Sequence, residues 1–275
     1  MNATVPEFAT EPAGPAPGHR AHRVLRDHIA DLSRRYSDNF HRVISSRWRH
    51  RYYYQRLNKL IGHIVLPGSR VLDIGCMRGD MLASLTPAYG VGIDICPTAV
   101  EAARQRHPDL HFRVLAGEDA AELNETFDYV ILSNVIGEVY DFRILLEAVR
   151  SVCHPRTRVV ISSYSRLWQP VLTLADWLRS RTALTADNWL PPDEVDNMLH
   201  LADFEVIRRH NSILLPLGVP IVAELFNRWI SPLPIINHLC LQSFCIARPR
   251  QLRPADRPQS SFSVVVPARN EAGHI

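Results

Sequence analysis

Residues 69–80, SRVLDIGCMRGD, constrain the fold more than any other part of this 275-residue chain. Val71, Leu72 and Ile74 form a short apolar run, which is typical of a strand buried inside a parallel sheet. Gly75 and Gly79 follow at the carboxyl end of that run, where glycine lets the backbone turn sharply and lets a ligand approach closely. The segment therefore predicts a strand, a glycine loop and a helix.

A second strand, GVGIDI, begins eleven residues after Gly79 and carries Asp94 near its end. In an open α/β sheet, an acidic side chain at the end of the second strand is placed to accept hydrogen bonds from a ribose. The order of strand, loop, helix, strand and acid predicts one nucleoside-binding half of a doubly wound α/β sheet.

The spacing distinguishes between nucleosides. A dinucleotide site favours G-x-G-x-x-G after the strand, whereas this chain has D-x-G-C-x-x-G, with Asp73 before the glycines. A carboxylate would repel a pyrophosphate but suits a ligand with a cationic amino-acid end. The segment resembles the first motif of class I S-adenosylmethionine-dependent methyltransferases, with Met77 where that motif commonly has a glycine. A Rossmann-type turn without a ligand is the alternative interpretation.

The resemblance implies the class I methyltransferase fold, a mostly parallel, seven-stranded Rossmann-like sheet, and S-adenosyl-L-methionine as the cofactor. It also implies that either Glu118 or Asp119 meets the adenine, although each could instead cap the following helix. No metal is expected. The cofactor-binding residues expected on this basis are Asp73, Gly75, Cys76, Gly79, Asp94, Ile95, Glu118, Asp119, Ser133 and Asn134.

The family places methyl transfer beside the end of the fourth strand, which we expect to break at Ser133 and Asn134. The sulfonium of the cofactor is already activated, so positioning does most of the work. A hydroxyl acceptor would also need a general base. The sequence does not choose among the candidates for that base, which are Glu138, Tyr140, His154 and Tyr164. A non-catalytic binding or scaffold module with the same fold is the alternative function.

The amino-terminal region divides into a tail at residues 1–18, expected to be disordered, and a helical cover at 19–60. Between Arg20 and Lys59 there are eleven basic and three acidic residues, with apolar positions at helical spacing. We expect amphipathic helices near the mouth of the cofactor site. A basic surface for anionic lipid or a phosphate-bearing substrate is the alternative. No nucleic-acid reading motif is present, so nucleic acid is not an expected partner.

The methyltransferase domain is expected to span residues 61–248, with its sixth and seventh strands at 202–210 and 238–249. Between these strands lies an insertion, residues 212–237, with four prolines and many large apolar side chains. The prolines, together with Glu224 and Arg228, argue against a membrane span. Core packing, an apolar acceptor pocket and a membrane-facing patch are the three interpretations.

The carboxyl-terminal residues predict a linker at 249–262 and the start of a second domain at 263–275. The sequence FSVVVPARNEAGHI resembles the opening of a family 2 glycosyltransferase, so the chain is expected to be the front of a longer fusion. The methyl acceptor would then be a small molecule, a sugar or a lipid-linked glycan of cell-envelope synthesis.

Composition bears mainly on the source and the compartment. Thirty of the 31 basic residues are arginine, which we interpret as the coding bias of a GC-rich, bacterial genome. Five scattered cysteines without a signal peptide favour free thiols in a reducing cytoplasm. The expected localisation is cytoplasmic, with attachment to the inner face of the membrane if the insertion is a membrane-facing patch.

Overall fold

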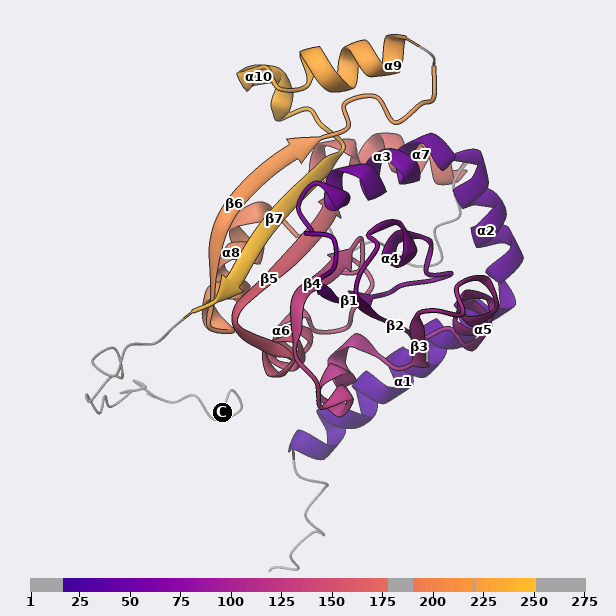
Figure 1. The fold of residues 1–275 in the computed structure, drawn as a ribbon, viewed down its shortest axis with the longest axis vertical. Coiled ribbons are helices and arrows are strands. Elements are labelled where there is room, and N and C mark those ends of the chain that lie inside the picture. The colour runs from indigo at the N-terminus through magenta and orange to yellow at the C-terminus, as the bar shows by residue number, and fades with distance from the viewer. Residues whose placement is uncertain (1–16, 178–189, 220, 251–275) are drawn as a thin grey trace, which may run out of the picture.

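The computed structural model describes residues 17–177, 190–219 and 221–250, and Figure 1 shows their arrangement. The predicted glycosyltransferase start at 263–275 lies outside the described residues. The same holds for almost all of the predicted tail at 1–18 and linker at 249–262.

A seven-stranded sheet forms the centre of the molecule, with the strand order β3-β2-β1-β4-β5-β7-β6. The first five strands are parallel, whereas β7 runs antiparallel to both of its neighbours. This arrangement confirms the predicted doubly wound, mostly parallel α/β sheet. The strands are β1 (Arg70–Ile74), β2 (Tyr89–Asp94), β3 (His111–Val114), β4 (Phe127–Ser133), β5 (Cys153–Tyr164), β6 (Phe204–Ser212) and β7 (Gln242–Pro249).

Helices cover both faces of the sheet. The helices α3 (Arg51–Gly62), α4 (Asp80–Ser84) and α5 (Pro97–Arg106) pack one buried cluster against the sheet. On the other face, a second cluster contains residues of η1 (Gly117–Leu123), α6 (Phe142–Ser151) and α8 (Pro192–Leu201). Because apolar side chains fill both faces, a ligand site is confined to an edge of the sheet.

The amino-terminal cover consists of three helices, α1 (Pro17–Asp38), α2 (Phe40–Arg49) and α3. Its first two helices are fixed to the ends of the strands (Figure 1). The Ser33 hydroxyl donates a hydrogen bond to the Ile95 carbonyl at 2.6 Å. Val43 shares a small buried cluster with Met77 of the glycine loop and with Cys96. The cover is thus packed directly on the loops that follow β1 and β2.

Two further segments stand at the same edge. The first is η2 (Arg166–Trp168) with α7 (Gln169–Trp177). The second is the β6–β7 connection, residues 213–241, which lies over the end of the sheet in Figure 1. This connection contains α9 (Val222–Glu224), a π-helical turn η3 (Leu225–Ile230) and α10 (Pro234–Asn237). None of the described helices combines the length and apolar character that a membrane crossing requires.

Side-chain hydrogen bonds hold the β6–β7 connection to the rest of the molecule. The Asn227 amide donates to the Tyr52 hydroxyl of α3 at 3.0 Å. The Trp168 indole N–H donates to the Leu239 carbonyl at 2.7 Å. The predicted insertion is therefore a helical segment docked on α3 and η2, and only part of it is buried.

Candidate active site

A cavity of about 460 Å³ lies at the carboxyl edge of the parallel strands, beneath the amino-terminal cover. Its walls come from the loops after β1, β2 and β4, from α1–α3, from η2–α7 and from the β6–β7 connection. The volume falls in the range of about 300–1,000 Å³ that is typical of ligand pockets. The described residues therefore enclose a site at the edge where the sheet topology predicts one.

Asp94 occupies the end of β2 and lines the cavity. Its carboxylate accepts hydrogen bonds from the backbone N–H groups of Met77 and Cys96, each at 2.8 Å. Burial raises the pKa of Asp94, and the two backbone donors oppose that rise. The carboxylate is thus fixed between the glycine loop and the start of α5.

Asp73 lies at the floor of the cavity and is buried. No hydrogen bond in the described part of the chain involves its side chain. Burial and, to a smaller extent, the neighbouring Asp94 raise its pKa to about 7, and Arg47 opposes both effects. A buried carboxyl group in this state is a fitting partner for a cationic ligand group, because a cation at hydrogen-bond distance would favour its ionised form.

The two glycines of the loop have different surroundings. Gly75 lines the cavity with φ +76°, and a Cβ there would lie 2.6 Å from Cγ2 of Val135. Gly79 has φ +72° and precedes α4, and a Cβ there would lie 2.5 Å from Cζ of Phe112. Gly79 does not line the cavity. Its position serves the turn and the packing of α4 rather than direct contact with a ligand.

Met77 replaces the usual glycine of the motif, and its backbone adopts φ +49°, the left-handed conformation that glycine favours. Its side chain lines the cavity and packs on Val43 of α2 and on Cys96. The methionine therefore joins the glycine loop to the helical cover.

The structure separates the two acids that follow β3. Glu118 lines the cavity, where burial raises its pKa. Asp119 points away and pairs with Arg26 of α1, with 2.7 Å between Arg26 Nη2 and Asp119 Oδ1. Neither side chain caps η1, which Ala116 precedes. The geometry thus favours Glu118 over Asp119 for contact with a ligand.

Ser133 and Asn134 both line the cavity at the end of β4. Asn134, with φ +56°, belongs to a closed network of buried and half-buried side chains. Its amide donates to the Tyr53 hydroxyl at 3.0 Å, Tyr53 donates to Gln242 at 2.7 Å, and the Gln242 amide donates back to Asn134 at 2.8 Å. The network connects the end of β4 to α3 and β7 and fixes this wall of the cavity.

The remaining two cofactor candidates also lie at the cavity. Cys76 is buried, and burial raises the pKa of its thiol well above the ordinary value. Its sulfur is a space-filling group next to Gly92, where a Cβ would lie 2.8 Å from it. Ile95 lines the cavity as well, and its carbonyl accepts the hydrogen bond from Ser33.

Two of the four general-base candidates, Glu138 and Tyr164, line the cavity. Glu138 accepts a hydrogen bond from the Tyr36 hydroxyl of α1. Tyr140 is 47% exposed and lies outside the cavity, with its ring centroid 5.4 Å from that of His28.

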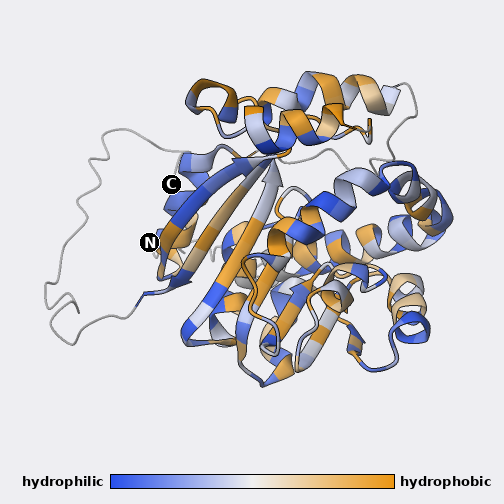
Figure 2. Ribbon diagram, turned by 45° about the horizontal axis from the view of Figure 1, so that its top comes forward, coloured by the Kyte–Doolittle hydropathy of each residue, from blue (hydrophilic) through white to orange (hydrophobic). Residues whose placement is uncertain are grey.

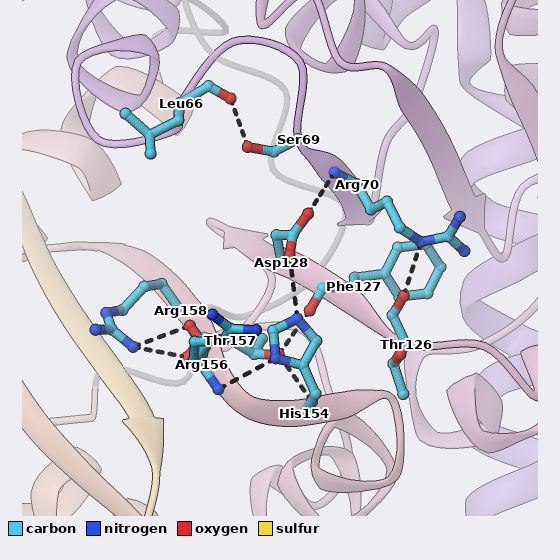
Figure 3. A network of polar contacts seen from close by, with 10 residues as sticks. All are labelled: Leu66, Ser69, Arg70, Thr126, Phe127, Asp128, His154, Arg156, Thr157 and Arg158. Atoms are coloured by element: carbon cyan, nitrogen blue, oxygen red, sulfur yellow. Dashed lines mark hydrogen bonds and ion pairs between the residues drawn. The ribbon is translucent and has the colours of Figure 1, made fainter.

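His154 requires a correction, because it lies at the opposite edge of the sheet. It is at the start of β5, where its imidazole contacts the Asp128 carboxylate with 3.1 Å between Nε2 and Oδ1. Asp128 in turn accepts a hydrogen bond from the backbone N–H of Arg70 at the start of β1, as Figure 3 shows. The amino ends of these strands meet here, far from the cavity at their carboxyl ends, so His154 joins strands and is not a candidate base.

Sequence reasoning did not single out Arg47, Tyr36 or Tyr53, although all three line the cavity from the helical cover. Arg47 places its guanidinium 4.0 Å from the centre of the Tyr54 ring, and its charge opposes the rise that burial causes in the pKa of both Asp73 and Asp94. The only signal in the sequence was the basic amphipathic pattern, which does not reveal which cation faces inward.

Comparisons with known proteins support the resemblance to methyltransferases that the glycine loop indicates. Residues 45–209, more than half of the chain, match the family described as "Methyltransferase domain". Demethylmenaquinone methyltransferase of Staphylococcus aureus is 28% identical over 160 residues, which cover 55% of this chain and 63% of that protein. The match thus spans less than two thirds of the length of this curated relative.

Solved structures show a similar fold. A SAM-dependent methyltransferase from Thermotoga maritima has a TM-score of 0.60 at 13% identity, covering 80% of this chain and all of that one. Magnesium protoporphyrin IX methyltransferase from Synechocystis, solved with bound SAH, has a TM-score of 0.57 at 16% identity. The latter comparison covers 80% of this chain and 99% of that one.

Proposed function

The chain belongs to the methyltransferase-domain family, whose cofactor is S-adenosylmethionine, and we propose that it transfers a methyl group from this cofactor to an acceptor with an apolar part. One observation supports the proposal above all. Asp73, which is buried and makes no hydrogen bond among the described residues, lines the cavity together with Asp94 and Gly75, with apolar walls opposite.

S-adenosylmethionine would supply an electrophilic methyl group on a sulfonium centre. The residues of this chain would bind and orient it. Asp73 presents a carboxylate for the cationic amino-acid end, and Asp94 has lone pairs beyond those used by Met77 and Cys96 for the ribose hydroxyls. Glu118 lies where the adenine would follow, and Arg47 offers a cation for the carboxylate end.

The acceptor side of the cavity is built from apolar side chains of three elements. They include Ile29 and Leu32 of α1, Leu172 and Ala175 of α7, and Leu215 and Leu241 of the β6–β7 connection. Such walls favour acceptors that bury an apolar group and exclude water from the reacting atoms. Among the small-molecule, sugar and lipid-linked classes expected from the sequence, we therefore place lipid-linked acceptors first. The relative named for demethylmenaquinone supports including quinones.

Glu138 is the preferred general base, because it lines the cavity after β4 and is oriented by Tyr36. Tyr164 is the second choice, since it lines the cavity from the end of β5. A carboxylate in hydrogen-bond reach of an acceptor hydroxyl can take up its proton as the methyl group is transferred.

Calorimetry with S-adenosylmethionine and S-adenosylhomocysteine tests the first part of this proposal, and labelled-methyl transfer to lipid-linked glycan and quinone extracts tests the second. We expect binding of both nucleosides and label in an extractable lipid. Absence of binding would remove the enzyme function. Binding without transfer to any acceptor would favour the non-catalytic scaffold.

A further inference from the structure

An unusual number of large apolar side chains on η2–α7 and the β6–β7 connection face solvent. The connection is visible at the top of Figure 2 as helical turns rich in hydrophobic residues. Monomeric soluble proteins rarely expose contiguous apolar patches larger than a few hundred Å². We call this surface the apolar platform. Its exposed members are Leu167, Val171, Leu174, Trp177, Leu217, Val219, Ile221, Val222, Leu225, Phe226, Trp229, Leu233, Ile235 and Leu239.

The mouth of the cavity lies within the apolar platform. Val171 and Leu217 both line the cavity, and they are 52% and 55% exposed. On α7, Leu172 and Ala175 face the cavity, while Leu174 and Trp177 face outward. A helix with apolar side chains on opposite faces is suited to an environment in which both faces contact apolar groups. Val171 and Leu217 therefore belong both to the cavity wall and to the apolar platform.

The helices beside the apolar platform carry only positive charge. Residues 40–62 of α2 and α3 contain six lysines and arginines and no acid. Arg51, Gln55 and Lys59 form an exposed stripe on α3. The adjacent stripe, Tyr52 and Arg56, contacts the β6–β7 connection through Asn227 and Glu224.

Within the platform, the acid Glu224 is neutralised. Its carboxylate lies 3.4 Å from Arg56 Nη1 and 3.8 Å from Arg228 Nη1. The β6–β7 connection and its flank on α2 and α3 thus combine apolar residues with an excess of cations over acids. This charge distribution is complementary to an anionic lipid surface.

Two exposed tryptophans fit the same partner. Trp177 is 78% exposed and Trp229 is 68% exposed, and Arg228 lies 5.7 Å from the Trp229 ring centre. Tryptophan is enriched where membrane proteins meet the lipid headgroups, because its ring is apolar and its N–H is polar. Helices with apolar and basic faces bind in that interface.

We propose that the apolar platform docks on a bilayer containing anionic lipid, so that the cavity mouth faces the lipid and receives the acceptor from it. The delivery of an acceptor rests on the proposed methyltransferase function, whereas docking itself does not. The occupant is a membrane surface rather than a protein, because the flanking helices offer a broad, acid-free cationic stripe instead of paired charges of both signs.

Sedimentation with vesicles tests the docking. We expect the protein to bind vesicles of phosphatidylcholine with phosphatidylglycerol, and to bind pure phosphatidylcholine at least tenfold more weakly. The double variant Trp229→Ser/Ile235→Ser should lose at least tenfold in affinity, because both side chains are exposed and lie outside the cavity. Leu201→Ser is the matched control, since Leu201 is 73% exposed on α8 and should leave vesicle binding unchanged.

A charge variant tests whether the basic residues of α3 attract the anionic lipid. Arg51→Glu/Lys59→Glu should abolish the preference for anionic vesicles. Equal vesicle binding by the wild type and the Trp229→Ser/Ile235→Ser variant would overturn the proposal. So would a stable dimer that this variant dissociates in ultracentrifugation, combined with no vesicle binding, since the platform would then cover a second copy.

Calorimetry with S-adenosylhomocysteine on the same preparations separates the two proposals. We expect the platform variant to bind the nucleoside as the wild type does. A protein that binds vesicles but no nucleoside would keep the docking and lose the methyltransferase function. A protein that binds the nucleoside but no vesicles would keep the methyltransferase function and overturn the docking.

Discussion

The backbone N–H of Met77 donates a hydrogen bond of 2.8 Å to the Asp94 carboxylate, which joins the glycine loop to the end of the neighbouring strand. The other oxygen of Asp94 accepts the N–H of Cys96 at 2.8 Å. One side chain therefore holds both loops that frame the cavity. A residue that sequence alone presents as a ligand contact is also part of the scaffold.

Asp94→Ala should weaken binding of S-adenosylhomocysteine at least tenfold, because charge-assisted hydrogen bonds contribute about 1.5–3 kcal/mol each. The sequence alone suggests that thermal stability would be spared. The structure predicts a lower melting temperature as well, since two buried N–H groups lose their acceptor at a cost of about 1–3 kcal/mol each. Asp94→Asn keeps one acceptor oxygen and should recover part of the stability but not the affinity. Calorimetry and thermal melts separate these effects, and unchanged affinity in Asp94→Ala would make the acid purely structural.

Gly75→Ala should reduce cofactor affinity. The positive φ of Gly75 disfavours alanine, and the new methyl group would meet Val135 at 2.6 Å. Gly75→Ala/Val135→Ala removes that contact and is the informative comparison. We expect part of the stability to recover in the double variant, since the strain of the positive φ remains, while affinity stays low because the cofactor approaches this position closely. Full recovery of affinity would show that Val135, rather than a close approach of the cofactor, makes glycine necessary.

The sequence predicted the sheet and the glycine loop because their signals are local. The apolar β-branched runs, the loop glycines Gly75 and Gly79, and the acids Asp73 and Asp94 lie within about 25 consecutive positions. The network of Tyr53, Asn134 and Gln242 could not be predicted in this way, since Tyr53 and Gln242 are 189 positions apart. Tertiary packing alone brings them together.

His154 illustrates another limit. Its residue type suits a general base, but it lies at the start of a parallel strand, and strand starts face the edge away from the site. The sheet topology therefore excludes His154 as a general base, although its residue type alone does not. Arg47 shows the converse, because a helix in a basic region can turn one cation inward without a distinctive local pattern.

Asp73 should make stability and cofactor binding depend on pH near neutrality. Its pKa is about 7 in the folded protein against an ordinary value of 3.8, so the fold holds a proton that the unfolded chain has lost between these values. The stabilisation this provides is fully present below pH 3.8 and is lost as the pH rises through about 7. Asp73→Asn should therefore stabilise the cofactor-free protein at pH 8, on the order of a few kcal/mol, and have little effect near pH 4.

Without cofactor, the folded protein favours the protonated form of Asp73, whereas bound cofactor should favour the ionised form. Affinity for S-adenosylmethionine should rise between pH 6 and pH 8 in the wild type, because the ionised Asp73 attracts the cationic end. The Asp73→Asn variant should bind weakly at both values. Calorimetry across this range gives the comparison, and a flat wild-type profile would contradict a role for Asp73 in binding.

Glu138→Gln and His154→Ala should affect different properties. Glu138→Gln should lower the methyl-transfer rate by about 10²–10⁴-fold, the usual contribution of a general base, with S-adenosylhomocysteine affinity unchanged. His154→Ala should leave the transfer rate unchanged and alter only stability, since its partner is Asp128 at the opposite edge. A loss of transfer in His154→Ala without a change in stability would contradict this assignment.

Deleting residues 251–275 should leave the melting temperature and the cofactor affinity unchanged. The boundary follows from the last described contacts of the domain. β7 ends at Pro249, and the Arg250 N–H donates to the Asp203 carbonyl at 2.7 Å. A deletion from 249 onward would remove that hydrogen bond and serves as a comparison, with a small loss of stability expected.

The apolar run 263–267 should also promote aggregation when no sheet covers it, so the shorter chain should be more soluble. A large loss of stability on deleting 251–275 would make the tail part of this domain and remove the support for a glycosyltransferase fusion and its glycan acceptor.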